Sequence, residues 1–273
     1  MSKNIEFSLN RISAPRIAFS DYLALCQRLN IKAIEIRNDL DGVELNDGTP
    51  AEKIRDLTAA AGITIRSINA LQRFDQFDAA REVEAREVIA YAAACGAEAL
   101  VLCPTCSPND SRTAVERHEA LVAALKALKP MLADHGVLGL IEPLGFEICA
   151  VRRKSQAVLA MYDAAGENDF KLVHDTFHHH LSGEDIFFPN LTGLIHISGV
   201  EDGNLPVNQM GDGHRVLVGE ADRLGNLRQL KVLLGRGYQG YVSYEPFAAE
   251  IAAATDIESR LRTSMSFIRT SLD

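Results

Sequence analysis

Short apolar runs of five to seven residues alternate with longer amphipathic segments along this chain, and this alternation limits the fold more than any other feature. The length of the runs and their β-branched content favour strands over helices. The eight predicted strands are residues 5–10, 33–37, 63–69, 98–103, 137–142, 170–175, 193–198 and 241–245. Strict alternation of strands and helices predicts parallel strands joined by right-handed crossovers.

The segments between the predicted strands have helical periodicity. In residues 78–95 and 112–135, apolar side chains recur at steps of three and four, with charged side chains between them. We expect Pro130 to kink or interrupt the second of these helices, because proline removes a backbone donor. Ser182, which precedes Gly-Glu-Asp, marks the expected start of a short sixth helix.

Eight repeats in 273 residues match one α/β barrel of the (β/α)8 type, a TIM barrel, which we expect to occupy residues 1–273 as a single domain. A doubly wound sheet is the other arrangement that such alternation allows. It is less favoured because no G-x-G-x-x-G motif follows any predicted strand. No linker rich in Pro, Ser or Gly divides the chain.

Charge and hydropathy limit the classes of partner. With 28 basic and 37 acidic residues the net charge is −9, so the surface repels a phosphate backbone and we expect no nucleic-acid partner. No run approaches the roughly 18 apolar residues of a membrane span, and MSKNIEFSLN lacks the apolar stretch of a signal peptide. We predict a cytoplasmic protein that acts on a small molecule; assembly into a homo-oligomer stays open.

Five scattered cysteines, an odd number in a chain of this length, favour a reducing compartment over a disulfide framework. Cys103 and Cys106 have C-x-x-C spacing, but no second cysteine pair accompanies them. We therefore expect them to pack at a strand end, and a redox or metal-binding role is the alternative.

Polar side chains at the ends of the last four predicted strands indicate a metal site. The active site of a TIM barrel lies at the carboxyl ends of its strands, where this chain places Glu142, Asp175, His196 and Glu245. Three carboxylates that converge on one axis repel each other unless a cation compensates them. Three oxygen donors and one imidazole suit Mn²⁺, Mg²⁺, Co²⁺ or Zn²⁺, among which we take Mn²⁺ as the first candidate.

Glu142 and Glu245 are each followed by a proline, which keeps the preceding residue extended at the end of its strand. The two glutamates come from the fifth and eighth predicted strands, so they are well placed to flank a bound substrate. Proton transfer between two bases needs this placement. We therefore predict that Glu142 and Glu245 are catalytic residues as well as metal ligands.

At these positions the chain resembles the xylose-isomerase-like TIM-barrel superfamily, and its segments are most similar to the inosose isomerase (2-keto-myo-inositol isomerase) branch. The superfamily also includes ketose 3-epimerases, hydroxypyruvate isomerase, inosose dehydratases and endonuclease IV. The segments that carry the resemblance are IEIRND, INALQRF, IEPLGF, VHDTFHHH, HISGVED and YEPF. The resemblance implies metal ligands at Glu142, Asp175, His196 and Glu245.

The resemblance also bears on contacts with the substrate. It implies that His178, three residues after the aspartate, touches the substrate or the outer shell of the metal. In the epimerase branch an arginine follows the histidine of the seventh strand by six residues. Here that position is Asp202, so Arg215 is the candidate for the missing cation. Arg37 and Asn69 are candidates for hydroxyl contacts, and for Arg37 an ion pair with a nearby acid is an equal alternative.

The stretch VHDTFHHHL, residues 173–181, holds half of the eight histidines of the chain. We expect Asp175, rather than any of these histidines, to bind the metal. His174 points away from Asp175 by strand alternation, into the layer between strands and helices. His179 and His180 are expected to line the loop after the strand.

Together these features predict a metal-dependent isomerase or epimerase of an inosose or related keto-polyol, an activity of inositol catabolism. The cation would hold a carbonyl and its adjacent hydroxyl, and would stabilise the enediolate that forms when a glutamate removes a proton. The alternatives are an inosose dehydratase on the same scaffold, a ketose isomerase similar to hydroxypyruvate isomerase, and a non-enzymatic sugar-binding or DNA-repair protein.

Overall fold

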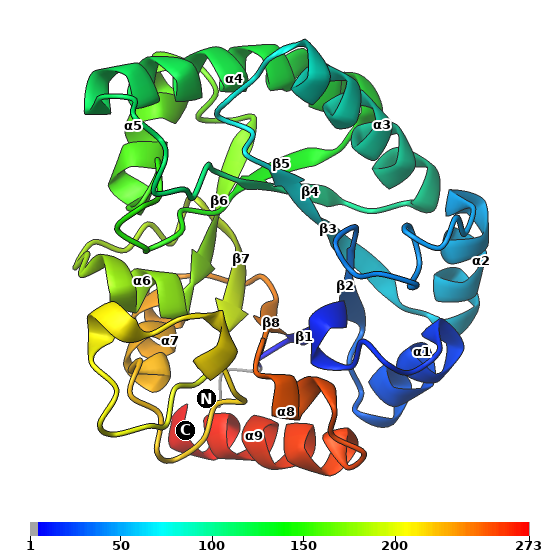
Figure 1. Cartoon of the computed structure of the whole chain (residues 1–273). Helices are drawn as coiled ribbons and strands as arrows, with labels where there is room; N and C mark the ends of the chain where they lie inside the picture. Colours follow the sequence, from blue (N-terminus) through cyan, green and yellow to red (C-terminus); the bar gives the residue numbers. More distant parts are fainter. Residues whose placement is uncertain (1–4, 273) are drawn as a thin grey trace.

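The strands form one closed parallel barrel in which each strand pairs with its neighbours along the chain and β8 pairs with β1. This is a computed structural model, and it describes residues 5–272 (Figure 1). The strands are β1 (Phe7–Asn10), β2 (Ala33–Arg37), β3 (Thr64–Gln72), β4 (Ala99–Cys103), β5 (Leu138–Ile141), β6 (Phe170–Asp175), β7 (Thr192–Ile197) and β8 (Val242–Tyr244). The TIM barrel predicted from the alternation is confirmed.

Helices surround the barrel (Figure 1). They are α1 (Phe19–Arg28), α2 (Ala51–Ala61), α3 (Ala79–Cys95), α4 (Ala114–His135), α5 (Lys154–Asp163), α6 (Thr176–Ser182), α7 (Asn226–Gly235), α8 (Ala249–Ala252) and α9 (Ile257–Leu272). Short 3-10 turns occupy Arg11–Ser13, Val207–Gln209 and Asp212–His214. Within residues 5–272, no helix combines the length and the apolar character that a membrane crossing needs.

The longest of these helices, α4, has clear end signals. The Thr113 hydroxyl accepts a hydrogen bond from the Glu116 N–H at 3.3 Å, and the Glu116 carboxylate accepts one from the Thr113 N–H at 2.7 Å. This reciprocal capping box satisfies two backbone donors at the start of the helix. Gly136 ends the helix in a left-handed conformation, with φ of 65°.

The helices differ from two expectations. Pro130 does not interrupt α4, which runs through it; Pro130 and Lys126, whose carbonyl loses its donor, are both exposed, so water can pair that carbonyl. Ser182 ends α6 instead of starting a helix. α6 begins early because the Asp175 side chain caps it, accepting from the His178 N–H at 3.0 Å. As a result, His179 and His180 lie in a helix and not in a loop.

Strand alternation divides the buried side chains between two cores. Outward-facing residues of the strands pack against the helices in the larger core. A smaller cluster fills the barrel interior and includes Leu140, Val173 and Leu194. These three side chains precede Glu142, Asp175 and His196 by two residues, so an apolar layer lies directly beneath the predicted ligands.

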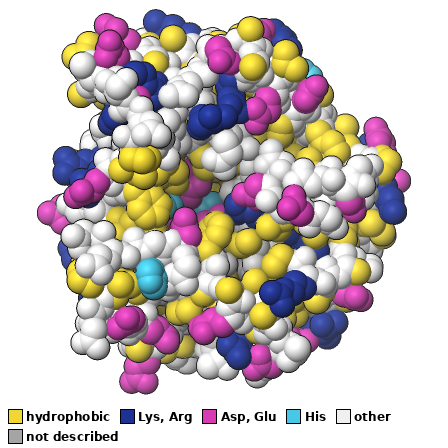
Figure 2. Space-filling model, viewed as in Figure 1, with side chains coloured by type: hydrophobic (Ala, Val, Ile, Leu, Met, Phe, Trp, Pro, Cys, Tyr) yellow, Lys and Arg dark blue, Asp and Glu magenta, His cyan; other side chains and the backbone are white. Residues whose placement is uncertain are grey.

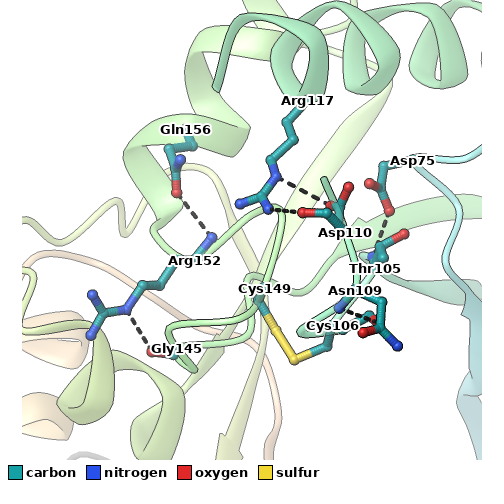
Figure 3. The surroundings of a disulfide bond; sticks show 11 residues. Asp75, Thr105, Cys106, Asn109, Asp110, Arg117, Gly145, Cys149, Arg152 and Gln156 are labelled. Atoms are coloured by element: carbon teal, nitrogen blue, oxygen red, sulfur yellow. Dashed lines mark hydrogen bonds and ion pairs between the residues drawn. A yellow bond between two sulfur atoms is a disulfide. The ribbon is translucent and has the colours of Figure 1, made fainter. Parts of the chain in front are cut away.

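A disulfide joins Cys106, which follows β4, to Cys149, which follows β5 (Figure 3). The prediction that Cys106 only packs at a strand end is therefore wrong, and the two C-x-x-C cysteines do not pair with each other. The sequence separation of 43 hides the pairing, whereas the adjacency of β4 and β5 brings the two loops together. Backbone bonds also join these loops: the Ala150 N–H donates to the Thr105 carbonyl at 2.8 Å and the Ser107 N–H to the Ile148 carbonyl at 3.2 Å.

The loop after β5 is packed tightly against α6. The Arg152 guanidinium donates to the carbonyl of Gly145 at 2.8 Å (Figure 3) and to the carbonyl of Leu181 at 2.9 Å. A Cβ atom at Gly145 would overlap the backbone carbonyl of His178. Only glycine therefore allows this approach between the loop and the helix.

We predict that Gly145→Ala destabilises the protein by about 1–3 kcal/mol, the usual range for overpacking a tight contact. The obstructing atom belongs to the backbone of α6, so a rotamer change cannot relieve the overlap. Gly203→Ala is the matched control, because a Cβ at that position meets no atom within 4 Å. Urea unfolding followed by circular dichroism measures both variants, and equal stability of the two would contradict the prediction.

Candidate active site

The four predicted metal ligands meet at the carboxyl ends of β5 to β8. Glu142, Asp175, His196 and Glu245 each offer a ligand atom within 4.8 Å of the others, and none of the four residues is more than 4% exposed. Nδ1 of His196 lies 2.9 Å from Oε1 of Glu142, 3.2 Å from Oε2 of Glu245 and 4.0 Å from Oδ2 of Asp175. This donor set fits a divalent cation, because buried carboxylates with one imidazole are both its ligands and its counter-charge.

Arg215 reaches this cluster from the long segment between β7 and β8. Its Nη2 donates to Oδ2 of Asp175 at 2.6 Å and to Oε2 of Glu245 at 2.9 Å, and the guanidinium lies 4.7 Å from the centre of the Phe247 ring. Asp202, at the position of the epimerase arginine, is exposed. Arg215, and not Asp202, therefore brings a positive charge to this cluster.

Arg37 also pairs with the cluster. Its Nη1 donates to Oε1 of Glu245 at 2.9 Å, while Nε and Nη2 bind the two carboxylate oxygens of Asp39 at 2.7 and 2.6 Å. The geometry therefore agrees with the alternative prediction for Arg37, an ion pair with nearby acidic residues. The side chain still lines the cavity described below.

Glu35, in the middle of β2, is a further carboxylate beside the four candidate ligands. The sequence analysis did not identify it as a site residue. Its Oε2 accepts from Nε2 of His196 at 3.1 Å and from Ser67 Oγ at 2.6 Å. Burial raises the pKa of Glu35, but the charge and hydrogen bond of His196 more than offset this and lower the pKa to about 2. The sequence did contain a signal for Glu35: it is two residues from Arg37 in one strand, so both side chains must face the same side.

The charges of the buried groups do not balance without a cation. Burial tends to raise the pKa of Glu245, yet His196, Arg215 and Arg37 hold it well below its usual value. Burial likewise tends to lower the pKa of His196, yet Glu245, Glu35 and Glu142 hold it well above. Four buried carboxylates face two guanidinium groups, so two negative charges remain when His196 is neutral. One divalent cation at the four ligands compensates them.

A cavity of about 210 Å³ opens at these ligands and is the hollow near the middle of the face in Figure 2. Glu142 and Glu245 both line it. The four residues predicted to contact the substrate line it as well: Arg37, Asn69, His178 and Arg215. Phe146 and Phe247 supply apolar wall, and sequence reasoning did not identify them as part of the site.

His178 and Cys103 are two further polar groups on the cavity wall. The His178 ring packs edge-on against Phe146, with 5.2 Å between centroids, and its buried Nδ1 has no hydrogen-bond partner among the described residues. The Cys103 thiol lies 3.6 Å from Oε2 of Glu142. Burial, followed by the nearby charge of Glu142, raises the pKa of Cys103, so this side chain remains a thiol beside the glutamate.

The other histidines of residues 173–181 face away from the cavity. Nε2 of His174 hydrogen-bonds Oε1 of Gln229 in α7 at 2.9 Å, which confirms its predicted direction. Nδ1 of His179 lies 2.6 Å from Nζ of Lys154. Burial and the Lys154 charge lower the pKa of both histidines, to about 3 for His179, so both rings are neutral near pH 7.

Comparison with solved structures gives matches over nearly the full length of the chain. A xylose isomerase domain containing protein from Salmonella typhimurium is 31% identical, with 97% of this chain and 99% of that chain covered and a TM-score of 0.90. The IolI protein with a bound zinc atom is 22% identical, with 98% of each chain covered and a TM-score of 0.84. D-psicose 3-epimerase from Clostridium cellulolyticum, solved with D-tagatose, is 14% identical, with 98% and 100% covered and a TM-score of 0.75.

The last two likenesses, at low identity, show the shared fold alone. No curated protein matches the chain. The model of the xylose isomerase-like TIM barrel family matches residues 23–271, which include all four candidate ligands and the whole cavity wall. The chain therefore belongs to the xylose isomerase-like TIM barrel family.

Proposed function

We propose that the protein is a divalent-metal-dependent isomerase or epimerase of an inosose or a related keto-polyol. The observation that carries the proposal is the placement of Glu142 and Glu245, which come from β5 and β8, line one cavity and share one ligand cluster. The zinc in the IolI protein and the ketose in D-psicose 3-epimerase support this choice, because both proteins have the same fold. The proposal includes a cytoplasmic role in inositol catabolism.

The residues of the cavity have distinct tasks in this reaction. When bound at Glu142, Asp175, His196 and Glu245, a cation supplies a Lewis acid that stabilises negative charge on a substrate oxygen. One glutamate removes the proton from the carbon beside the carbonyl, which gives the enediolate. The other glutamate, or the same one, returns the proton to a neighbouring or the same carbon. Arg215 and Arg37 pair with Glu245 and hold its carboxylate in place at the cavity.

The cavity wall suits a polyol more than an apolar ligand. Aromatic rings of Phe146 and Phe247 offer surface for C–H groups, while the guanidinium groups of Arg37 and Arg215 offer donors for hydroxyls. Ligand sites of this kind bind through apolar contact and obtain their orientation from a few polar groups. A small cyclic polyol ketone matches this mixture.

A dehydratase is the second candidate, and one observation favours it. Loss of a hydroxyl from the carbon next to the enediolate needs a general acid near the leaving oxygen. His178 lines the cavity and its Nδ1 has no partner among residues 5–272, so its ring is free to serve in this way. His214, in the turn before Arg215, is exposed, and its Nδ1 accepts a hydrogen bond from the Gly211 N–H at 3.0 Å, so it is the weaker candidate.

Incubation of the Mn²⁺-loaded protein with 2-keto-myo-inositol in D₂O tests the proposal. We expect a new inosose or ketose that carries deuterium at the carbon beside the carbonyl, detected by NMR. Absorbance of an unsaturated diketone would identify the dehydratase instead. Absence of both products and of deuterium exchange would contradict both candidates.

We predict that Glu142→Gln and Glu245→Gln each lower kcat by at least about 10²-fold, since each removes a proton-transfer group. Glu147→Gln is the matched control, because Glu147 is an exposed glutamate of the loop that follows Glu142. Steady-state kinetics measures the effect, and circular dichroism checks that the fold persists. Near-normal turnover in both cluster variants would rule out the two-glutamate scheme.

Removal of the metal should abolish activity and lower stability. A ligand present at 100 times its Kd stabilises the folded state by about 2.7 kcal/mol, so Mn²⁺ should raise the unfolding temperature of EDTA-treated protein. Asp175→Asn should weaken this rise, because it removes a ligand charge. Full activity in a protein shown by elemental analysis to be metal-free would contradict the metal requirement.

A further inference from the structure

We infer that Glu35 is a positioning residue that fixes the ring of His196, so that Nδ1 of this histidine faces the metal site. This inference rests on the metal site of the proposed function. It adds a fifth residue, from β2, to a cluster whose four ligands come from β5 to β8.

The carboxylate of Glu35 is itself held rigidly. Oε2 accepts from Ser67 Oγ at 2.6 Å, from Asn69 Nδ2 at 2.7 Å and from His196 Nε2 at 3.1 Å. Oε1 accepts from the hydroxyl of Ser243 in β8. The side chain is fully buried, and it reaches across the barrel interior from β2 to β7 and β8. Four donors on three other strands leave it little freedom to move.

With a cation at the ligand cluster, these contacts determine which nitrogen of His196 carries the proton. An ionised carboxylate can only accept hydrogen bonds, and both ring nitrogens face carboxylates: Nε2 faces Glu35, and Nδ1 faces Glu142 and Glu245. A cation bound by Glu142 and Glu245 would take the place of the proton on Nδ1, so the remaining ring proton stays on Nε2 and is donated to Glu35. In neutral histidine one ring nitrogen is protonated and the other has a free lone pair. With Nε2 protonated toward Glu35, the lone pair is on Nδ1, which lies 2.9 Å from Glu142 and 3.2 Å from Glu245.

The barrel register makes this arrangement possible. Glu35 is the register partner of Ser67 across β2 and β3, and His196 is the register partner of Ser243 across β7 and β8. All four side chains therefore lie inside the barrel next to the ligands. Carboxylates that orient a metal-binding histidine in this way usually contribute 10- to 100-fold to metal affinity.

Two substitutions separate the charge of Glu35 from its hydrogen bond. In Glu35→Gln the amide oxygen should stay at the Oε2 position, because Asn69 Nδ2 is strictly a donor. The amide N–H then donates to Ser243, and the proton of His196 stays on Nε2. Glu35→Met removes both the charge and the hydrogen-bond acceptor. Glu35 then no longer determines which ring nitrogen of His196 is protonated.

Zn²⁺ is the probe, with affinity measured by competition with a chelator and ring protonation by ¹H–¹⁵N NMR of His196. We expect Glu35→Gln to weaken Zn²⁺ binding by about 10-fold with Nε2 still protonated, and Glu35→Met to weaken it by up to about 100-fold. Glu44→Gln is the matched control, because Glu44 is a buried carboxylate that pairs with Arg11 at 2.6 Å, away from His196. Its Zn²⁺ affinity should equal that of the unaltered protein.

The outcomes distinguish this inference from the proposed function. Zn²⁺ affinity within twofold of normal in both Glu35 variants would overturn the role of Glu35, whatever the activity. An equal loss in Glu44→Gln would overturn it too, because the effect would then be general destabilisation. Normal Zn²⁺ binding without turnover of any inosose, combined with the expected losses in the variants, supports Glu35 and contradicts only the proposed reaction. If Glu35→Met does not fold, Glu35→Gln alone decides.

Discussion

Charge compensation inside a closed barrel is the constraint on which the rest of this site depends. Four carboxylates are buried together, with at most 4% of each residue exposed, so contact with solvent compensates little of their charge. Arg37 and Arg215 compensate part of this negative charge through ion pairs of 2.9 Å or less. The cluster can therefore be folded and still be short of positive charge, which is the electrostatic condition for holding a divalent cation.

The sequence was enough to predict the architecture and the convergence of the four candidate ligands. The alternation of strands and helices predicts a closed barrel, and the carboxyl ends of a barrel's strands share one face. Reading the polar residues at or next to the end of each strand from β5 to β8 therefore finds residues that are up to 103 positions apart, from Glu142 to Glu245. This works because each ligand stands at a position that local periodicity defines.

The features that sequence reasoning missed lie away from the ends of the strands. Glu35 lies in the middle of a strand, where a filter on strand ends does not look. The pairing of Arg215 with Asp175 and Glu245 depends on the path of a long irregular segment. Ser182 was wrongly predicted to start a helix, because a serine before glycine and acidic residues resembles a helix start. In the structure Asp175, at the end of β6, caps the start of that helix, and Ser182 ends it.

The disulfide between Cys106 and Cys149 lies in a short two-stranded contact beside the cavity (Figure 3). Two backbone hydrogen bonds lie on either side of the disulfide, one between Ala150 and Thr105 and one between Ser107 and Ile148. They join the two loops independently of the bond between the sulfur atoms. Breaking the bond between the sulfurs would leave these backbone bonds in place. The disulfide and the two backbone hydrogen bonds therefore join the loops after β4 and β5 at the same place, so the connection between these loops does not depend on the disulfide alone.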